Sequence, residues 1–292
     1  MFRQRTGSVV CASCGSLVGV NDDTCYNCGR RNPGLWGFGP ALRRFGNDLG
    51  FVTLVLYGSV VLYAATLIVS LALGEGVGGG SLFGALGPGT DTLYLFGASG
   101  ALPTFRDGRW WTLLSAGWLH AGALHILFNM MWVRQLGPAV ADIFGAARMI
   151  IIYTIAGVCG FLLSSVLGHY LPGVPFVGGG QFTVGASAPI FGLLGALVHY
   201  GNRGGSSLVK SEALGYAGTL FVFGLIMPGV DNGAHAGGFV GGYLASMWLD
   251  PLKRERMDHF IGAAVCLLAT FAAVAASILT LLPQLIRAFS RG

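Results

Sequence analysis

Charged residues are scarce in this chain of 292 residues, where they make up 10% of the sequence, against about 25% in a typical soluble domain. Hydrophobic residues make up 53%, and the mean hydropathy is +0.68. This imbalance argues against a soluble enzyme and indicates a membrane protein. The net charge of +5 comes from residues between apolar runs, which suits membrane orientation better than nucleic-acid binding.

Two further absences narrow the class of protein. Residues 1–21 contain no apolar stretch of the kind found in secretory signals, so we expect no cleaved leader. Charged residues are almost missing inside the apolar runs. That disfavours a small-molecule transporter or channel, whose pathway would place such residues in the bundle interior.

Apolar segments are abundant and predict an all-α polytopic membrane protein. We find seven: 51–73, 111–135, 148–170, 186–201, 208–227, 234–249 and 259–282. Five reach the roughly 20 residues that a helix needs to cross a bilayer. The fourth and sixth are short and begin with small or polar residues. Such helices are expected where backbone lines a cavity at membrane depth.

The basic residues predict a cytoplasmic N-terminus. With that orientation the inner segments carry 13 of the 17 lysines and arginines, as the positive-inside rule requires. The thirteen are Arg3, Arg5, Arg30, Arg31, Arg43, Arg44, Arg134, Arg148, Arg203, Lys210, Lys253, Arg254 and Arg256. The outer segments hold Arg106, Arg109, Arg287 and Arg291. Seven spans place the C-terminus outside, where the last two fit the rule poorly.

The segment 74–109 is the only long connection between predicted spans. Its stretch 93–96 is apolar, so we expect it to dip into the membrane interface, with Trp110 and Trp111 as interfacial anchors. The alternative is a flexible linker.

Polar side chains within the apolar segments are few and are functional candidates. His125 and Asn129 are four residues apart, so they share one face of the second predicted helix. His120 is expected near the start of that helix. Ser187 opens the fourth segment and His235 the sixth. All three spans begin at the outer surface in the predicted topology, so this polar set can converge there.

These residue types suit nucleophilic catalysis. Serine needs a base to take its proton, and histidine is the usual base. An asparagine amide and a histidine N–H are suitable donors to an oxyanion. Small residues would let the fourth and sixth helices approach closely; they are Gly192, Gly195, Gly238, Gly241 and Gly242. Each feature alone is more often structural, but their joint occurrence on three alternate spans favours a site.

With these motifs the chain resembles the rhomboid family of intramembrane proteases over about 94–250. Four stretches carry the resemblance: Gly108-Arg109-Trp110-Trp111, His120…His125…Asn129, Gly185-Ala186-Ser187, and Asp231-Asn232-Gly233-Ala234-His235-Ala236-Gly237-Gly238. The chain departs from the family pattern at Thr112, at Asp142 and at Pro189. These departures concern loop contacts and stability rather than catalytic groups.

The resemblance implies a six-helix core with a seventh helix added after it. It implies a serine endopeptidase with Ser187 as nucleophile and His235 as general base, without a catalytic cofactor. His125 and Asn129 would form the oxyanion hole with the Ser187 backbone N–H, and Phe191 would pack on the His235 ring. The expected substrates are transmembrane proteins with small residues at the cut, in a bacterial plasma membrane, with the site opening outward. The alternative is a pseudoprotease that binds and routes membrane proteins.

Four cysteines near the N-terminus form two CxxCG knuckles, Cys11 with Cys14 and Cys25 with Cys28. Four thiolates suit structural zinc, and a glycine after each pair permits a tight turn. Two disulfides are the alternative, disfavoured in a reducing cytoplasm. The head would bind a cytoplasmic regulator, or control assembly or substrate delivery; nucleic acid is disfavoured because few basic residues accompany it. Cys159 and Cys266 stand alone in apolar runs, where small buried or lipid-facing residues are expected.

These features divide the chain into four parts. We expect a zinc-ribbon head at 1–34, a linker at 35–50, the membrane core at 51–250, and a seventh helix with a tail at 251–292.

Overall fold

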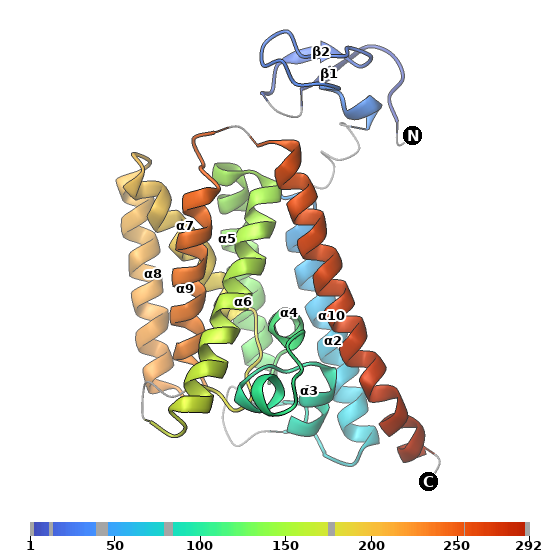
Figure 1. Ribbon diagram of the computed structural model, residues 1–292, viewed down its shortest axis with the longest axis vertical. Coiled ribbons are helices and arrows are strands. Elements are labelled where there is room, and N and C mark those ends of the chain that lie inside the picture. Colours follow the sequence, from blue (N-terminus) through green and yellow to red (C-terminus); the bar gives the residue numbers. More distant parts are fainter. Residues whose placement is uncertain are drawn as a thin grey trace.

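The computed structural model is a bundle of helices with a small two-stranded head beyond one end (Figure 1). It describes residues 3–11, 14–38, 46–78, 84–174, 179–253 and 255–289. Part of the expected linker, 39–45, lies outside the described residues, as do Arg43, Arg44, Arg254 and Arg291 from the charge count.

Seven long helices form the bundle in the described part of the chain. They are α2 (Phe51–Ala72), α5 (Ala123–Phe144), α6 (Ala146–Tyr170), α7 (Ser187–Asn202), α8 (Ser207–Ile226), α9 (Asn232–Trp248) and α10 (Met257–Phe289). Four of them are long and apolar enough to cross a membrane: α2, α6, α8 and the Met257–Thr280 part of α10. The expectation of five such spans was therefore too high by one. The missing one is α5, whose hydropathy is lowered by His125, Asn129, Arg134 and Gln135.

The second span also begins later than the apolar run 111–135 predicts. Residues 112–118 form two short turns, α4 (Thr112–Ser115) and η3 (Ala116–Trp118), and the chain is extended at Gly122 before α5 begins. The helix then continues past the apolar run, through Pro138, and ends at Gly145. Hydropathy cannot separate a buried apolar turn from a spanning helix, which is the reason for the shift.

Helix α7 is the centre of the bundle. Its residues from Ala188 to His199 are all buried, and it packs on α5, α6, α8 and α9. A Cβ atom at Gly242 would overlap the backbone of Gly192, and one at Gly238 would overlap that of Ala188. These glycines therefore bring α7 and α9 into backbone contact, as expected.

Gly241 does not belong to that contact, and its assignment to it was wrong. A Cβ atom there would meet the Cys159 side chain of α6. Because α9 presents glycines on two faces, it packs closely on α6 as well as on α7. Cys159 is the half-buried partner in this second contact.

The connection between α2 and α5 is folded onto the bundle. It contains α3 (Thr90–Phe96), the π-helical turn η2 (Leu102–Arg106), α4 and η3. Leu93, Leu95 and Phe96 are buried in a small core with Leu119, packed against partly buried residues of α2. The apolar stretch is thus held by protein contacts, so the flexible-linker alternative is wrong for residues 93–96.

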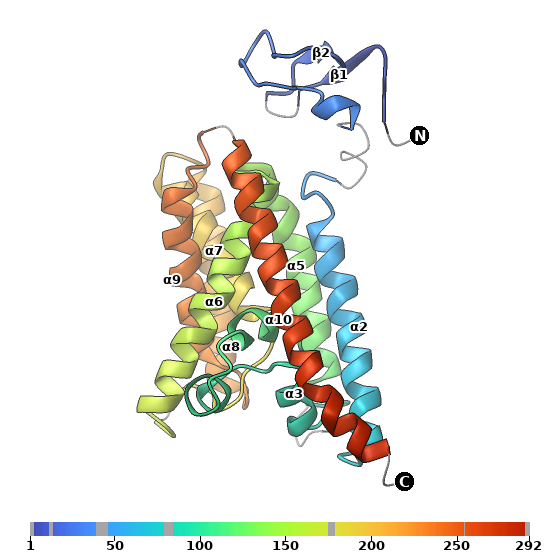
Figure 2. The same ribbon diagram turned by 45° about the vertical axis from the view of Figure 1, so that its right-hand side comes forward.

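Helix α10 runs along the outside of the bundle, from the end that carries the head to the opposite end (Figures 1 and 2). It packs on α6, α4 and α3. Near its far end the indole nitrogen of Trp111 donates a hydrogen bond to Ser277 Oγ at 3.1 Å. Arg109 donates to Thr280 Oγ1 at 3.4 Å and to the backbone oxygen of Tyr94 at 2.6 Å. The added helix is therefore bonded to the loop before α5.

The head is a β-hairpin with its own small core. Strands β1 (Ser8–Val10) and β2 (Leu17–Gly19) pair antiparallel, with Val9 opposite Val18. Both valines are buried together with Val20, Cys11 and Cys25. A short turn, η1 (Leu35–Gly37), follows where the linker was expected to begin.

Candidate active site

Ser187 is the first residue of α7 and is half-buried. The turn before it depends on Gly185, whose φ of +124° is strained for other residues. The backbone N–H of Gly185 donates to Ala116 O at 3.0 Å. Two residues earlier, Thr183 and Ser99 exchange backbone hydrogen bonds of 2.8 and 3.0 Å. The loop before α5 therefore fixes where α7 begins.

His235 lies in the first turn of α9 and is buried. Its ring is stacked on Phe191, with centroids 4.2 Å apart and planes at 15°. Phe191 is one helical turn after Ser187, so the expected packing is present and brings the imidazole beside the start of α7. At the edge of the ring, His235 Nδ1 lies 3.1 Å from Asn232 Oδ1.

His125 and Asn129 lie on the same face of α5, as their spacing predicts. The Asn129 amide donates to the His125 backbone oxygen at 2.9 Å. Both side chains face the turn before Ser187: a Cβ atom at Gly185 would lie 2.6 Å from His125 Nε2 and 3.7 Å from Asn129 Nδ2. A side chain at Gly185 would therefore fill the space in front of both donors.

His120 lies just before α5 and is fully buried. Its ring meets the His125 ring edge to face, with centroids 5.2 Å apart. His120 therefore packs against His125, and its observed ring contact is not with Ser187.

Two residues at the start of α9 were given no role from the sequence. Asp231 caps the helix by accepting from Ala234 N at 2.9 Å, and it also accepts from Ser164 Oγ of α6. Asn232 contacts the His235 ring. The available signal was an Asp-Asn pair three to four residues before a histidine, which is the position of a helix cap.

Comparison with known proteins identifies the architecture. A model of the rhomboid domain matches residues 107–252, which is half of the chain. The chain belongs to the rhomboid family. It is 31% identical over 183 residues to rhomboid protease GluP of Bacillus subtilis (strain 168), covering 62% of this chain and 34% of GluP.

Plant rhomboids are similar at the same level. RHOMBOID-like protein 7 of Arabidopsis thaliana is 35% identical over 175 residues, covering 56% of this chain and 50% of that protein. RHOMBOID-like protein 4 of the same plant is 32% identical over 171 residues, covering 54% and 39%. This rhomboid thus spans a third to a half of the length of these relatives.

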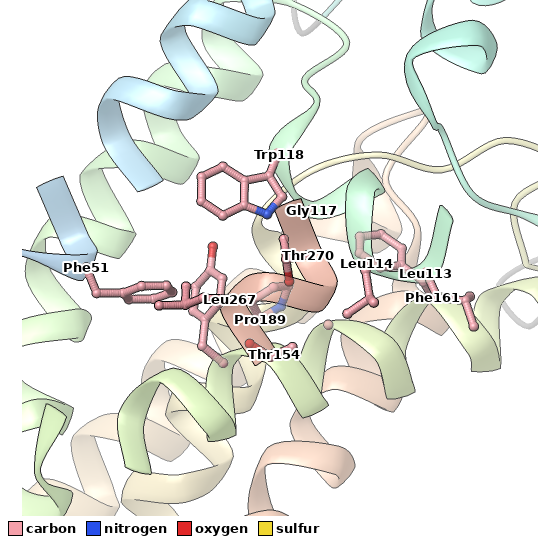
Figure 3. A pocket seen from close by; sticks show the side chains of 12 residues that line it. Phe51, Leu113, Leu114, Gly117, Trp118, Thr154, Phe161, Pro189, Leu267 and Thr270 are labelled. Carbon is pink, nitrogen blue, oxygen red and sulfur yellow. The ribbon is translucent and has the colours of Figure 1, made fainter. Parts of the chain in front are cut away.

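A small cavity lies next to the first turn of α7 in this rhomboid. Its volume is about 20 Å³, enough for one water-sized molecule. Figure 3 shows Phe51, Trp118, Leu267 and Pro189 around it, from four different parts of the chain. Pro189 is two residues after Ser187, but neither Ser187 nor His235 lines the cavity. It is therefore not the space in which a peptide would reach the serine.

The four cysteines of the head come together. Their Sγ atoms all lie within 4.8 Å of one another. Cys11 and Cys28 are 3.7 Å apart, and Cys14 and Cys25 are 3.6 Å apart. In a zinc tetrahedron with Zn–S bonds of about 2.3 Å the sulfurs lie about 3.8 Å apart. The set therefore fits a four-coordinate metal, and none of these four cysteines is in a disulfide.

The knuckle turns favour the same geometry. Gly15 N donates to Cys11 O at 3.1 Å and Gly29 N to Cys25 O at 2.8 Å. Both glycines have positive φ, +76° and +69°. Hydrogen bonding by Ser16 lowers the pKa of Cys14 to about 6. A thiolate is the form that ligates metal, so this ligand is prepared at neutral pH.

Proposed function

We propose that this rhomboid is a serine endopeptidase that cleaves transmembrane proteins within or near their membrane segments. The observation that carries the proposal is the position of the His235 ring, stacked on Phe191 one turn after Ser187 and bonded through Nδ1 to Asn232. A histidine held in this way beside a helix-start serine is suited to act as its base.

The hydrogen-bond partners assign opposite roles to two histidines. An amide oxygen can only accept, so His235 Nδ1 carries the hydrogen toward Asn232 and Nε2 remains a base. His125 Nδ1 instead accepts from the backbone N–H of Ala121 at 3.3 Å. In the neutral ring its Nε2 therefore carries the hydrogen and acts as a donor.

The reaction follows from these roles. Ser187 Oγ attacks the peptide carbonyl carbon while His235 Nε2 takes the hydroxyl proton. The oxyanion accepts hydrogen bonds from His125, Asn129 and the Ser187 backbone N–H. The C–N bond then breaks, His235 gives its proton to the leaving amine, and an acyl ester remains on Ser187. Water attacks the ester, with its proton passing to His235, and the carboxylic product leaves as Ser187 recovers the proton.

The surroundings of the enzyme form part of the proposal. The protein lies in a bacterial plasma membrane with its head in the cytoplasm and the Ser187 site opening to the outer face. Zinc held by the four cysteines would stabilise the head, which takes no part in the reaction. Residues 1–34 and 51–250 are the head and the core, joined by 35–50, and α10 follows within 251–292. A cytoplasmic regulator is the expected partner of the head.

Labelling by a fluorophosphonate probe tests this proposal. The purified full-length protein should be labelled on one serine, and the label should disappear in Ser187→Ala and in His235→Ala. Ser211→Ala, at an exposed position of α8, serves as the matched control and should label like the natural protein. Label on a different serine, or turnover of a transmembrane substrate by Ser187→Ala, would refute the assignment; absence of both label and turnover would favour the pseudoprotease alternative.

A further inference from the structure

A groove opens between the beginnings of α2, α6 and α10, in the half of the bundle near the head. Its volume is about 780 Å³. Leu54 and Tyr57 of α2, Ile150 of α6, and Phe260 and Leu267 of α10 are among its lining residues, none of which is charged. Because α2, α6 and α10 are candidate membrane spans, a bilayer would surround this part of the protein.

One cation of the head reaches this groove. Arg30, directly after the second cysteine knuckle, donates a hydrogen bond to Met257 Sδ at 3.5 Å. Its guanidinium carbon lies 5.9 Å from the centroid of the Phe260 ring, which lines the groove. The buried Nε of Arg30 has no hydrogen-bond partner among the described residues. The positive charge of Arg30, with its unpaired Nε donor, thus lies beside an uncharged, apolar groove.

We propose that this groove binds an anionic phospholipid, with an acyl chain along the groove and the phosphate at Arg30. Basic residues where transmembrane helices meet the cytoplasmic surface are suited to anionic lipid head groups, and acyl chains to apolar grooves. The nearby carboxylates are engaged elsewhere. Asp48 accepts from Val52 N at 2.7 Å, Glu255 from Arg148 N at 3.0 Å, and Asp258 pairs with Arg256 at 3.0 Å.

The metal site positions the phosphate-binding arginine. The backbone oxygen of Arg30 accepts from Cys25 N at 2.8 Å, and Thr24 bridges to Arg31. The knuckle that holds the metal therefore also fixes Arg30. The head then has a use that requires no protein partner: it completes a lipid site whose remaining walls belong to the membrane core.

Binding is tested on the zinc-loaded full-length protein in a neutral detergent. Palmitoyl-oleoyl phosphatidylglycerol and the corresponding phosphatidylcholine are added separately, and bound lipid is counted by native mass spectrometry. We expect one phosphatidylglycerol retained in preference to phosphatidylcholine. Arg30→Gln should weaken that preference about fivefold, the contribution of one arginine near an anionic surface. Arg31→Gln, an exposed neighbour in the same knuckle, is the matched control and should leave it unchanged.

Further arms test the groove and the source of the anion. Ala264→Phe, which narrows the groove, should reduce binding of both lipids. A photoreactive phosphatidylglycerol should label the peptide around Phe260 in the natural protein, a readout that requires no variant to fold. Equal retention of the two lipids, an unchanged preference in Arg30→Gln with normal zinc content, or equal thermal stabilisation by inorganic phosphate alone would each overturn the proposal.

Discussion

His235 Nδ1 lies 3.1 Å from Oδ1 of Asn232, three residues earlier on the first turn of α9. The Asn232 amide also donates to Phe221 O of α8 at 3.4 Å, so its oxygen is directed to the ring. The bond fixes both the orientation of the imidazole and the nitrogen that carries its hydrogen. In the proposed reaction Asn232 is therefore a positioning residue for the base.

Replacing Asn232 tests this role. Asn232→Ala should lower kcat by about 10- to 100-fold, since a well-placed general base contributes about 10²- to 10⁴-fold and only its orientation is weakened. KM should change little. Asn232→Asp keeps an acceptor for Nδ1 and should recover most of the rate, whereas a merely structural residue would not show this rescue. Asn202→Ala, at an exposed position at the other end of α7, is the control for general damage.

Loss of either oxyanion donor should slow the chemical step without weakening substrate binding. Asn129→Ala and His125→Ala should each lower kcat by about 10- to 1,000-fold, the upper part being the loss of one oxyanion donor. KM should stay near its original value, because these donors act on charge that develops only in the transition state. Steady-state kinetics with a transmembrane substrate in detergent measure both constants. Unchanged kcat in both variants would mean that this face of α5 is structural.

Ser187 and His235 should behave as one unit. Ser187→Ala and His235→Ala should each abolish cleavage, and the double variant should be no worse than either single one, because members of a catalytic unit are not additive. Circular dichroism and thermal unfolding should show a retained fold. A further large loss in the double variant, measured above background hydrolysis, would contradict the pairing.

The head should contain one metal ion per chain. Elemental analysis of the full-length protein should give about one zinc, falling to none when Cys11 and Cys14 are both changed to serine. Chelation should unfold the hairpin, because structural zinc sites of this size fold with their metal. Its core without metal is only a few valines around the buried Cys11 and Cys25. Zinc-free protein with paired disulfides would refute this expectation.

A protein that begins near Leu35 should keep the chemical step. The head lies beyond the end of the bundle at which α2 begins (Figure 1). The start of α7 lies deeper in the bundle, where Ala188 packs on Gly160 near the middle of α6. Helix α6 rises by about 1.5 Å per residue, so the stretch from its beginning near the head to Gly160 corresponds to about 20 Å. The shortened enzyme should cleave a model substrate in detergent at close to the full-length rate, and it should lose the preference for anionic lipid. An inactive shortened protein with a folded bundle would contradict this independence.

The sequence predicted the short helices well and the second span poorly. The starts of α7 and α9 carry small and polar residues that interrupt hydropathy, so their limits fell within a few residues of those observed. Between Trp111 and His120 the interruptions at Thr112, Ser115 and Gly117 are scattered, so they do not mark where a helix begins. Only tertiary contacts, such as burial of Trp118 against the bundle core, show that this stretch is a packed turn.

The residues of the candidate site could be predicted from residue types and spacing, but the orientations of their side chains could not. The sequence could relate His125 to Asn129 because four residues make one helical turn. It could not tell that Asn232 rather than solvent contacts His235 Nδ1, since this depends on the side-chain torsions at a helix start. The sequence also could not show whether Gly241 packs on α6 or on α7, because glycines lie on two faces of α9.

The hydrogen bonds from Trp111 to Ser277 and from Arg109 to Thr280 affect where the protein can be divided to make a chimera. The matched rhomboid domain ends at residue 252, yet two residues near its beginning are bonded to side chains more than twenty residues beyond that end. A chimera that ends at the domain boundary would leave the Trp111 indole and the Arg109 guanidinium without these hydroxyl partners. Grafting this domain into another chain therefore requires α10, or a helix with hydroxyl side chains at equivalent positions.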